Sequence, residues 1–273
     1  MHGKVIVITG FARGLGLATT RKLKAEGATV IGIDCLNGPV DLQLDGSYCF
    51  DLTDGDALEK AVESIQSLFG DVDILINNAG LLTLEHGESG VTANARRALE
   101  VNLFAAWELT SALLPGLLRR NGKLINVSSL FAMVNAPYVA AYAASKRGLS
   151  AWSDVMRMQY GDALDVVTVY PGFIDTAIHQ PAELAGLSVK RLVSFKWGDK
   201  VVLSLEEPLE SASKGLVRAC HKRGLRNRGL TLMGTLTFFC ARAMPSLIDA
   251  FISLRLRQLT RSGQLSLKPE LID

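Results

Sequence analysis

The 273-residue sequence has few cysteines, little net charge and no long apolar run that is free of charges. Its four cysteines, at positions 35, 49, 220 and 240, form no C-x-x-C pair, and none lies at metal-ligand spacing from a histidine. We therefore expect free thiols in a reducing compartment and no metal site. The 29 Lys and Arg residues nearly balance the 27 Asp and Glu residues, and the resulting charge of +2 does not favour nucleic acid as a partner.

Nothing in the sequence resembles an export signal or a regular membrane span. No signal-like segment precedes the first expected strand, which begins at Lys4, so we expect a cytoplasmic protein. The longest apolar stretch near the C-terminus, 236–254, contains Arg242, Pro245 and Asp249. A spanning helix needs about 20 predominantly apolar residues with few or no charges. We therefore expect this stretch not to cross a bilayer.

Short apolar runs alternate with segments of helical length. Strands are expected at 4–9, 29–34, 48–50, 73–76, 123–127 and 166–170, and helices at 15–26, 56–69, 94–118 and 140–160. This alternation predicts parallel strands joined by right-handed crossovers, with helices on both faces. The expected fold class is α/β, a doubly wound, mostly parallel sheet of the Rossmann type. Ligands in such folds bind beyond the carboxyl ends of the strands.

One domain with a C-terminal extension is the simplest organisation, because no repeat or flexible linker interrupts the chain. We place a dinucleotide-binding and catalytic domain at 1–235, with a substrate lid at about 177–208. An apolar, basic extension follows at 236–273. Residues 214–261 hold ten Lys or Arg and a single acid, Asp249, for a net charge of +9, whereas 1–213 carry −6.

Three glycines, Gly10, Gly14 and Gly16, lie between the first strand and the first helix. Glycine there permits a tight turn and lets backbone N–H groups and the helix N-terminus approach a pyrophosphate. The alternative is a turn that only reverses the chain. Asp34 ends the second strand, 24 residues after Gly10, where an acid binds the adenosine ribose diol and repels a 2′-phosphate. Asp34 therefore favours NAD, whereas Arg13 could pair with the 2′-phosphate of NADP.

Tyr142 and Lys146 lie four residues apart, so both can project from one helix face toward one site. A nearby ammonium favours the phenolate, and we expect Lys146 to lower the tyrosine pKa from about 10. Such a tyrosine can serve as a general acid or base. Ser129, at the end of the strand 123–127, could donate to a substrate oxygen, although a turn or capping hydroxyl is the alternative. Tyr138 has no lysine four residues later and is expected to serve packing.

The motifs together resemble the short-chain dehydrogenases/reductases over about residues 4–176. The elements that carry the resemblance, in order, are Thr9 to Gly16, Asn77-Asn78-Ala79-Gly80, Asn102, Ser129, Tyr142-x-x-x-Lys146 and Pro171-Gly172-Phe173-Ile174-Asp175-Thr176. The resemblance implies a nicotinamide cofactor, hydride transfer between a hydroxyl and a carbonyl carbon, and a homodimer or homotetramer.

The resemblance also implies residue roles. Tyr142 would move the substrate proton, Lys146 would hold the nicotinamide ribose, and Ser129 would orient the substrate oxygen. Asn102 would interrupt its helix and support a water chain from Lys146. The remaining residues would contact the cofactor: Gly10, Arg13, Gly14, Leu15, Gly16 and Asp34 at the glycine turn and ribose, Asp51 and Leu52 at the adenine, Asn78, Ala79 and Gly80 beside the adenosine ribose, and Pro171, Gly172, Ile174 and Thr176 at the carboxamide and phosphates.

Beyond residue 176 the chain departs from the family pattern. The expected lid is rich in apolar residues, which indicates either an apolar substrate or completion of the core. Met244, Leu247, Ile248, Phe251, Ile252 and Leu259 form one apolar stripe, with Arg255, Arg257 and Arg261 toward its end. A basic amphipathic helix of this kind can pack on its own domain or a partner subunit, which we favour, or lie on an anionic membrane.

The sequence therefore predicts an NAD-dependent oxidoreductase that interconverts a lipophilic secondary alcohol and its ketone, of steroid, retinoid or fatty-acyl type. Its expected partner is this small molecule, not nucleic acid. One alternative is an NADPH-dependent carbonyl reductase of the same family. Another is a nucleotide-binding scaffold without turnover, which the combination of Ser129, Tyr142 and Lys146 disfavours.

Overall fold

The structure is a computed structural model that describes residues 1–188, 190–191, 194–197, 200–204 and 206–263. Its centre is a sheet of seven parallel strands in the order β3-β2-β1-β4-β5-β6-β9. The strands are β1 (Val5–Thr9), β2 (Thr29–Asp34), β3 (Gly46–Cys49), β4 (Ile74–Asn77), β5 (Lys123–Val127), β6 (Asp165–Val169) and β9 (Asn227–Arg228). The predicted doubly wound α/β fold is confirmed.

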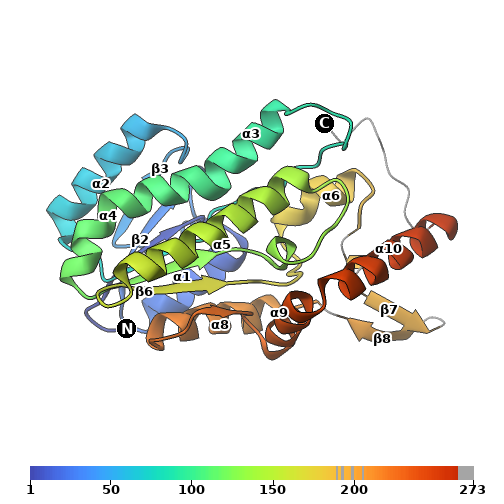
Figure 1. Cartoon of the computed structure of the whole chain (residues 1–273). Helices are drawn as coiled ribbons and strands as arrows, with labels where there is room; N and C mark the ends of the chain where they lie inside the picture. The colour runs from blue at the N-terminus through green and yellow to red at the C-terminus, as the bar shows by residue number, and fades with distance from the viewer. Residues whose placement is uncertain (189, 192–193, 198–199, 205, 264–273) are drawn as a thin grey trace.

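Helices cover both faces of the sheet, because successive side chains along a buried strand point to opposite sides. In β1, Ile6 and Ile8 join one core cluster, whereas Val7 joins the other. Figure 1 shows α4 and α5 on one side of the sheet and α8 on the other. The helices of the domain are α1 (Gly14–Ala25), α2 (Gly55–Phe69), α3 (Ala93–Leu99), α4 (Ala105–Arg119), α5 (Ala140–Tyr160) and α8 (Leu209–His221).

The chain leaves β1 toward β2 on one side and later reaches β4 on the other side, so the strand order reverses between these two neighbours. Ligands of doubly wound sheets bind at such a reversal, outside the carboxyl ends of the strands. Gly10 follows β1 directly, and Asn78 follows β4. The fold therefore brings the glycine turn and the Asn78-Ala79-Gly80 segment to the same edge.

The helix predicted at 94–118 is divided in the structure. A π-helical turn at Glu100–Phe104 separates α3 from α4, so the helical hydrogen bonds widen at Asn102. This agrees with the interruption that the family resemblance implies at Asn102. The sequence did not indicate the last strand, β9, which contributes two residues that pair with Thr168 and Val169 of β6.

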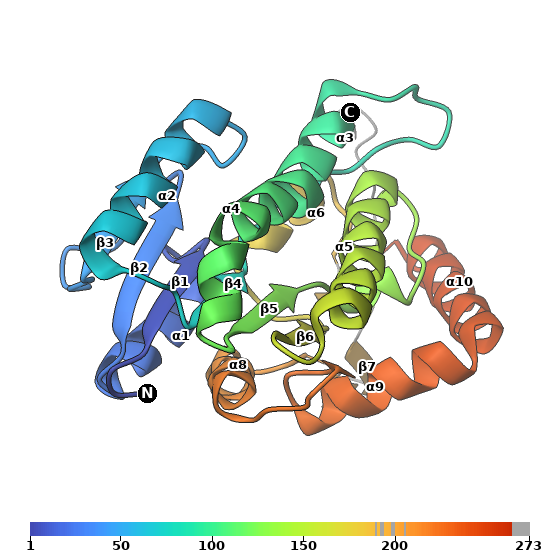
Figure 2. The same ribbon diagram turned by 60° about the vertical axis from the view of Figure 1, so that its left-hand side comes forward.

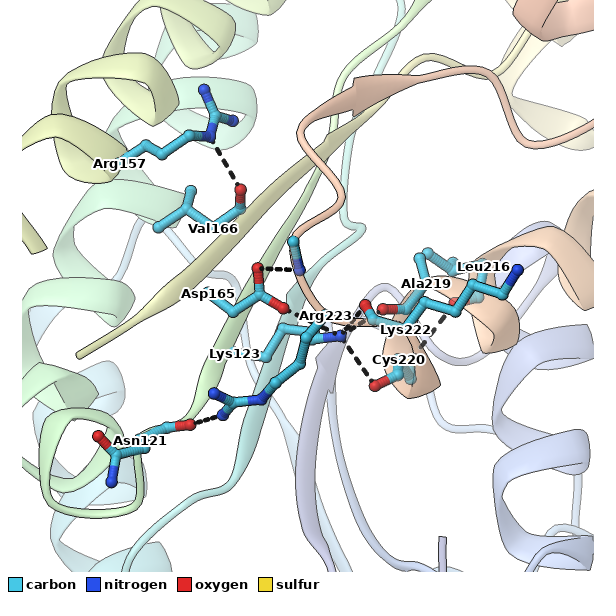
Figure 3. A network of polar contacts seen from close by, with 11 residues as sticks. Asn121, Lys123, Arg157, Asp165, Val166, Leu216, Ala219, Cys220, Lys222 and Arg223 are labelled. Carbon is cyan, nitrogen blue, oxygen red and sulfur yellow. Dashed lines mark hydrogen bonds and ion pairs between the residues drawn. The ribbon is translucent and has the colours of Figure 1, made fainter. Parts of the chain in front are cut away.

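A buried lysine joins three elements at the amino end of the sheet (Figure 3). Lys123, the first residue of β5, donates hydrogen bonds to the carbonyls of Ala219 at 2.7 Å, Cys220 at 3.0 Å and Lys222 at 2.6 Å. These carbonyls end α8, and a cation is favourable at a helix C-terminus. The ammonium also lies 3.3 Å from the carboxylate of Asp165 in β6. Burial lowers the pKa of Lys123, and Asp165 opposes that shift.

The predicted lid region contains a short 3-10 helix (Ala177–His179), α6 (Gln180–Leu184) and an antiparallel pair, β7 (Ser194–Trp197) and β8 (Lys200–Ser204). Ala182 and Leu187 are buried in a core cluster with Tyr142, whereas Leu184 is exposed. This part of the segment therefore completes the core. Val189, Leu192 and Val193 of the predicted lid lie outside the described residues.

Two helices, α9 (Leu232–Ala243) and α10 (Pro245–Arg261), form the C-terminal extension. The predicted single stripe of α10 is divided between two faces: Leu259 is buried, whereas Met244, Leu247 and Phe251 are exposed. Among the described residues, the helical stretch 93–119 is long and apolar enough to cross a membrane, but it supplies buried core residues such as Leu113. The pair α9 and α10 would be a second candidate only if these helices, bent by 109°, formed one span.

Candidate active site

A cavity of about 440 Å³ opens at the carboxyl ends of the strands. It is lined by residues that follow six different strands, β1 to β6, together with residues of α5, the lid region and α10. Apart from Asn102, every predicted site residue lines it: Gly10, Arg13, Gly14, Leu15, Gly16, Asp34, Asp51, Leu52, Asn78, Ala79, Gly80, Ser129, Tyr142, Lys146, Pro171, Gly172, Ile174 and Thr176. The topology thus gathers residues that lie up to 166 positions apart.

The glycine turn lies too close to neighbouring backbone to accept side chains at Gly10 and Gly16. Gly10 adopts φ +68°, and a Cβ there would lie 2.8 Å from the Cα of Ala79. A Cβ at Gly16 would overlap the carbonyl oxygen of Gly10. Asn78 holds the turn in place, because its side-chain amide donates hydrogen bonds to the carbonyls of Thr9 and Gly10, each at 3.0 Å. The three glycines line the cavity at the start of α1, and helix N-termini favour a pyrophosphate.

Asp34 is buried at the end of β2, and its carboxylate accepts hydrogen bonds from the amides of Ala12 at 2.9 Å and Leu36 at 3.1 Å. The carboxylate therefore holds the glycine turn in place and also lines the cavity. This position fits the role expected for Asp34 as a ribose ligand. Arg13 is exposed at the cavity edge.

Asp51 forms an ion pair with Arg97 of α3, a cavity residue that the sequence did not indicate. The Arg97 guanidinium and the amide and hydroxyl of Thr53 hold the pKa of the Asp51 carboxyl below its usual value. Asp51 is therefore fixed as an anion at the predicted adenine end. Arg97 could not be found from the sequence because its partner lies 46 residues away on another element.

Tyr142 is buried, and its ring lies edge-on to Phe131 with centroids 6.1 Å apart. Burial raises the pKa of the phenol, and hydrogen bonding with the Ser129 side chain opposes that shift. The prediction that Lys146 lowers the pKa of Tyr142 is therefore wrong in direction. The pKa of Tyr142 is raised because burial removes water from around the phenolate and so disfavours the charged form. Ser129 also accepts a hydrogen bond from the amide of Phe131 at 3.2 Å, so it caps a turn as well as facing the phenol.

Lys146 is also buried, and its ammonium donates to the carbonyl of Val127 at 2.9 Å. Burial lowers its pKa to about 8, because no carboxylate offsets the loss of water around the charge in the part of the chain described. A Cβ at Gly80 would lie 3.1 Å from this ammonium, so glycine at that position leaves room for it.

Asn102 lies beside the main cavity without lining it. Its side chain is buried and is hydrogen-bonded to both backbone groups of Leu81 and to the Ser145 hydroxyl. It also borders a second cavity of about 10 Å³ next to Asn77. This volume is near the minimum of roughly 10–15 Å³ that holds one water. Asn102 therefore positions the segment after Gly80, and the predicted water chain stays a prediction.

Glu207 is a cavity residue that the sequence analysis missed. It is 2% exposed, and its carboxylate accepts the amide of Gly172 at 2.9 Å. Its own amide donates to the carbonyl of Phe173 at 2.7 Å. Burial raises the pKa of Glu207, and the Gly172 amide and Thr231 oppose the shift. The sequence Glu206-Glu207-Pro208 does not indicate that the Glu207 side chain is buried.

The substrate side of the cavity is mostly apolar. Its lining includes Leu130, Phe131, Val134, Phe173, Ile178, Ile248, Phe251 and Ile252. His179 adds a polar group beside Phe173, with ring centroids 4.7 Å apart, and burial lowers its pKa to about 4. The histidine is therefore neutral at pH 7. In the described part of the chain, no group of three or more His, Cys, Asp or Glu side chains is arranged to hold a metal ion.

Residues 4–185 match the family model described as short chain dehydrogenase. The chain is 31% identical over 212 residues to the ketoacyl reductase HetN of Nostoc sp., covering 71% of this chain and 74% of that protein. It is 33% identical over 215 residues to the 3-oxoacyl-[acyl-carrier-protein] reductase FabG of Thermotoga maritima, covering 72% and 86%.

Solved structures with the same fold include proteins with either dinucleotide. A short-chain dehydrogenase from Burkholderia cenocepacia in complex with NADP has a TM-score of 0.71 at 24% identity, covering 93% of this chain and 98% of that one. One from Mycobacterium paratuberculosis bound to NAD has a TM-score of 0.69 at 22% identity, covering 86% and 98%.

Proposed function

The chain belongs to the short-chain dehydrogenases/reductases, a family of NAD(P)-dependent oxidoreductases, and we propose that it interconverts a lipophilic secondary alcohol and its ketone with NAD as cofactor. The observation that carries this proposal is the sharing of one cavity by the glycine turn, the Ser129, Tyr142 and Lys146 side chains, and an apolar wall.

The residues around the cavity suggest how each takes part. Gly10, Gly14 and Gly16 would hold the pyrophosphate against the start of α1, and Lys146 would hold the nicotinamide ribose. The cofactor would supply the hydride acceptor or donor. Tyr142 exchanges a proton between its phenol and the substrate oxygen, and Ser129 donates a hydrogen bond to the same oxygen. Such proton transfer contributes about 10²–10⁴-fold to rate in enzymes.

NAD is the preferred cofactor in this proposal because Asp34 places a carboxylate at the end of β2, within the cavity and fixed by two backbone amides. An anion there disfavours a 2′-phosphate. The apolar lining of the substrate side supports a lipophilic substrate, since transfer of apolar surface from water is favourable by about 25 cal/mol per Å².

A reductase that uses NADPH is the second candidate, and observations at Tyr142 and Arg13 favour it. Burial raises the pKa of the Tyr142 phenol, and the protonated phenol is the form that donates a proton to a ketone oxygen. Arg13 at the cavity edge could pair with a 2′-phosphate. Two of the relatives above are named as reductases, one of a ketoacyl group and one of a 3-oxoacyl-[acyl-carrier-protein].

We further propose a homodimer or homotetramer that acts in the cytoplasm. Exposed apolar side chains on α4 and α5, among them Trp107, Val155 and Met158, support burial against another copy of the chain. Trp107 stacks on Trp152 with ring centroids 5.3 Å apart, which gives this face a rigid aromatic centre.

Initial rates with both cofactors test the proposal. Steroid, retinoid and hydroxy fatty acyl alcohols are oxidised with NAD or NADP, and the matching ketones are reduced with NADH or NADPH. We expect a higher kcat/KM with the NAD pair, and we expect Asp34→Ala to shift the preference toward the NADP pair. A large NADP preference in the unmodified protein would contradict the role given to Asp34. Absence of turnover with all substrates and both cofactors would favour the scaffold alternative.

A further inference from the structure

The C-terminal extension carries exposed apolar side chains at helical spacing. On α9 these are Leu232, Leu236 and Phe239, which are 80%, 53% and 56% exposed. On α10 they are Leu247 and Leu254, which are 64% and 65% exposed, together with Phe251 between them. Spacings of four and three residues place each set along one side of its helix. We call these two sets the outer stripe.

Apart from Phe251, which also lines the cavity, the outer stripe is distinct from the face by which α10 packs on its own domain. Ile248 and Ile252 line the cavity, and Leu259 is buried in a core cluster with Tyr142. Each residue turns an α-helix by about 100°, so these residues lie on a different side of α10 from Leu247 and Leu254. The helix is therefore anchored by one apolar side, and its second apolar side is not needed to hold it in place.

Positive charge borders the outer stripe. Residues 232–261 contain four arginines and a single acid, Asp249. Arg242, Arg257 and Arg261 are exposed, whereas Asp249 is occupied by two hydrogen bonds of 2.9 Å from Asn135. Arg261 lies seven residues after Leu254, as Leu254 lies seven after Leu247, so all three share one side of α10. This combination of apolar and cationic side chains matches an interface that presents both hydrocarbon and negative charge.

The position of the outer stripe agrees with such an interface. Figure 2 shows α9 and α10 as two arms that meet at a corner on the edge of the molecule. Phe251 belongs to the outer stripe and also lines the cavity, so the stripe extends to the cavity wall. The two helices together also meet the length and hydropathy criteria of a broken membrane segment.

We propose that the outer stripe of α9 and α10 docks the protein on an anionic lipid surface, next to the wall of the active-site cavity. The apolar side chains lie in the interfacial layer of the bilayer, and Arg242, Arg257 and Arg261 contact lipid phosphates. This docking does not rest on the proposed activity, because it depends on the surface of the extension alone.

A second copy of the chain is a weaker occupant of this face. Two such faces packed together would bring a net charge of +3 from each copy into one interface. Like charges placed opposite one another across an interface oppose association. An anionic bilayer instead attracts the arginines and neutralises their charge.

Sedimentation of the full-length protein with lipid vesicles tests the docking. Vesicles of phosphatidylcholine with 30% phosphatidylserine are compared with vesicles of phosphatidylcholine alone, at low and high salt. We expect binding to the anionic vesicles that weakens at high salt. Leu247→Ser with Leu254→Ser should lower the partition coefficient by about tenfold or more, because less apolar surface enters the interface. Arg257→Gln with Arg261→Gln should lower it by about thirtyfold.

Matched controls replace residues of the same kinds elsewhere. Val40→Ser with Leu68→Ser removes two other exposed apolar side chains, and Lys60→Gln with Arg96→Gln removes two other exposed charges. Both control proteins should bind vesicles like the unmodified protein. All variants change exposed residues, and circular dichroism checks that they are folded. The proposal is overturned if the unmodified protein does not bind anionic vesicles at low salt, or if the stripe variants bind as well as the controls. Conversion of a dimer to a monomer by the Leu247 and Leu254 substitutions, without vesicle binding, would assign the face to a second copy.

Discussion

The ammonium group of Lys146 donates a 2.9 Å hydrogen bond to the backbone carbonyl of Val127, and both residues are buried beside the predicted nicotinamide site. The Lys146 side chain projects from helix α5, and Val127 is the last residue of the central strand β5. The bond holds the ammonium at the carboxyl edge of the sheet, where a cofactor ribose would meet it. It also requires a charged group to stay in a site from which most water is excluded.

Lys146 should make the stability of the fold depend on alkaline pH. Burial lowers its pKa to about 8 in the folded protein, from 10.5 in an unfolded chain. Between these values the unfolded chain binds more protons, so the free energy of unfolding should rise with pH. The rise is about 3 kcal/mol for a shift of this size. Urea unfolding at pH 7.5, 9.0 and 10.3 measures it.

Lys146→Met provides the comparison, because it replaces the lysine with an apolar side chain of similar length. The difference in unfolding free energy between the unmodified protein and this variant should change in favour of the lysine as pH rises. Curves that stay parallel across this range would contradict the buried ammonium.

Tyr142→Phe should abolish turnover without loss of cofactor binding. The phenol lies in the cavity with Ser129, and its removal eliminates the proton that general acid catalysis needs. We expect kcat to fall by about 10²–10⁴-fold, with the dissociation constant of the dinucleotide changed by less than about twofold. Stopped-flow rates and fluorescence titration measure the two quantities. Tyr138→Phe, a change of the same kind four residues earlier, should leave both unchanged; residual activity of the Tyr142 variant near that of this control would remove Tyr142 from the proton transfer.

Glu207 should position the segment after β6 through the Gly172 amide. In Glu207→Leu this amide loses its acceptor, and a buried unpaired donor costs about 1–3 kcal/mol. We expect a lower melting temperature and several-fold weaker dinucleotide binding. Glu207→Gln keeps an oxygen for the amide and should bind the dinucleotide like the unmodified protein. Equal effects of both variants on binding would show that the hydrogen bond to Gly172 is not what matters.

Glu207 also gives a pH dependence with a defined sign. Burial raises its pKa above 4.5, so the folded protein retains this proton more strongly than the unfolded chain. The stability of the unmodified protein should therefore fall, relative to Glu207→Gln, as pH rises from 4.5 through the raised pKa. Thermal unfolding of the two proteins from pH 4.5 to 8 measures the difference. A constant difference would contradict the raised pKa.

Lys123→Met should destabilise the fold and leave the cavity intact. The change removes the donor to three carbonyls at the end of α8 and leaves Asp165 without its cation. Loss of one partner of a buried ion pair costs about 3–5 kcal/mol. Dinucleotide affinity should be unchanged, because Lys123 begins β5 and the cavity lies beyond its other end. Adding Asp165→Asn to this variant should recover part of the lost stability in a double-mutant cycle, and no recovery would mean that capping of α8 is the main contribution.

Residues that act through local spacing could be predicted from the sequence. Gly10 and Tyr142 lie in patterns whose geometry depends on a turn or on one helical repeat, and the parallel sheet then brings them to a common edge. Neither the burial of Glu207 nor that of Lys123 could be predicted, because their partners lie 35 to 99 residues away along the chain. The pKa direction of Tyr142 was wrong for a related reason: spacing indicates which groups are near, whereas burial depends on the complete fold.

Because of the π-helical turn at Glu100–Phe104, the side chains of α3 and α4 do not follow one continuous helical register. This turn accommodates one residue more than a regular turn would, and each residue of an α-helix turns the chain by about 100°. Deletion of a single residue there would make the helix continuous, and Asn102 could not face Leu81 while Leu109 and Leu113 face the sheet. The extra residue thus lets one helical segment pack on the hydrophobic core and also bind the loop beside the catalytic lysine. Insertions or deletions at this point should therefore be far less tolerated than in the surface loops.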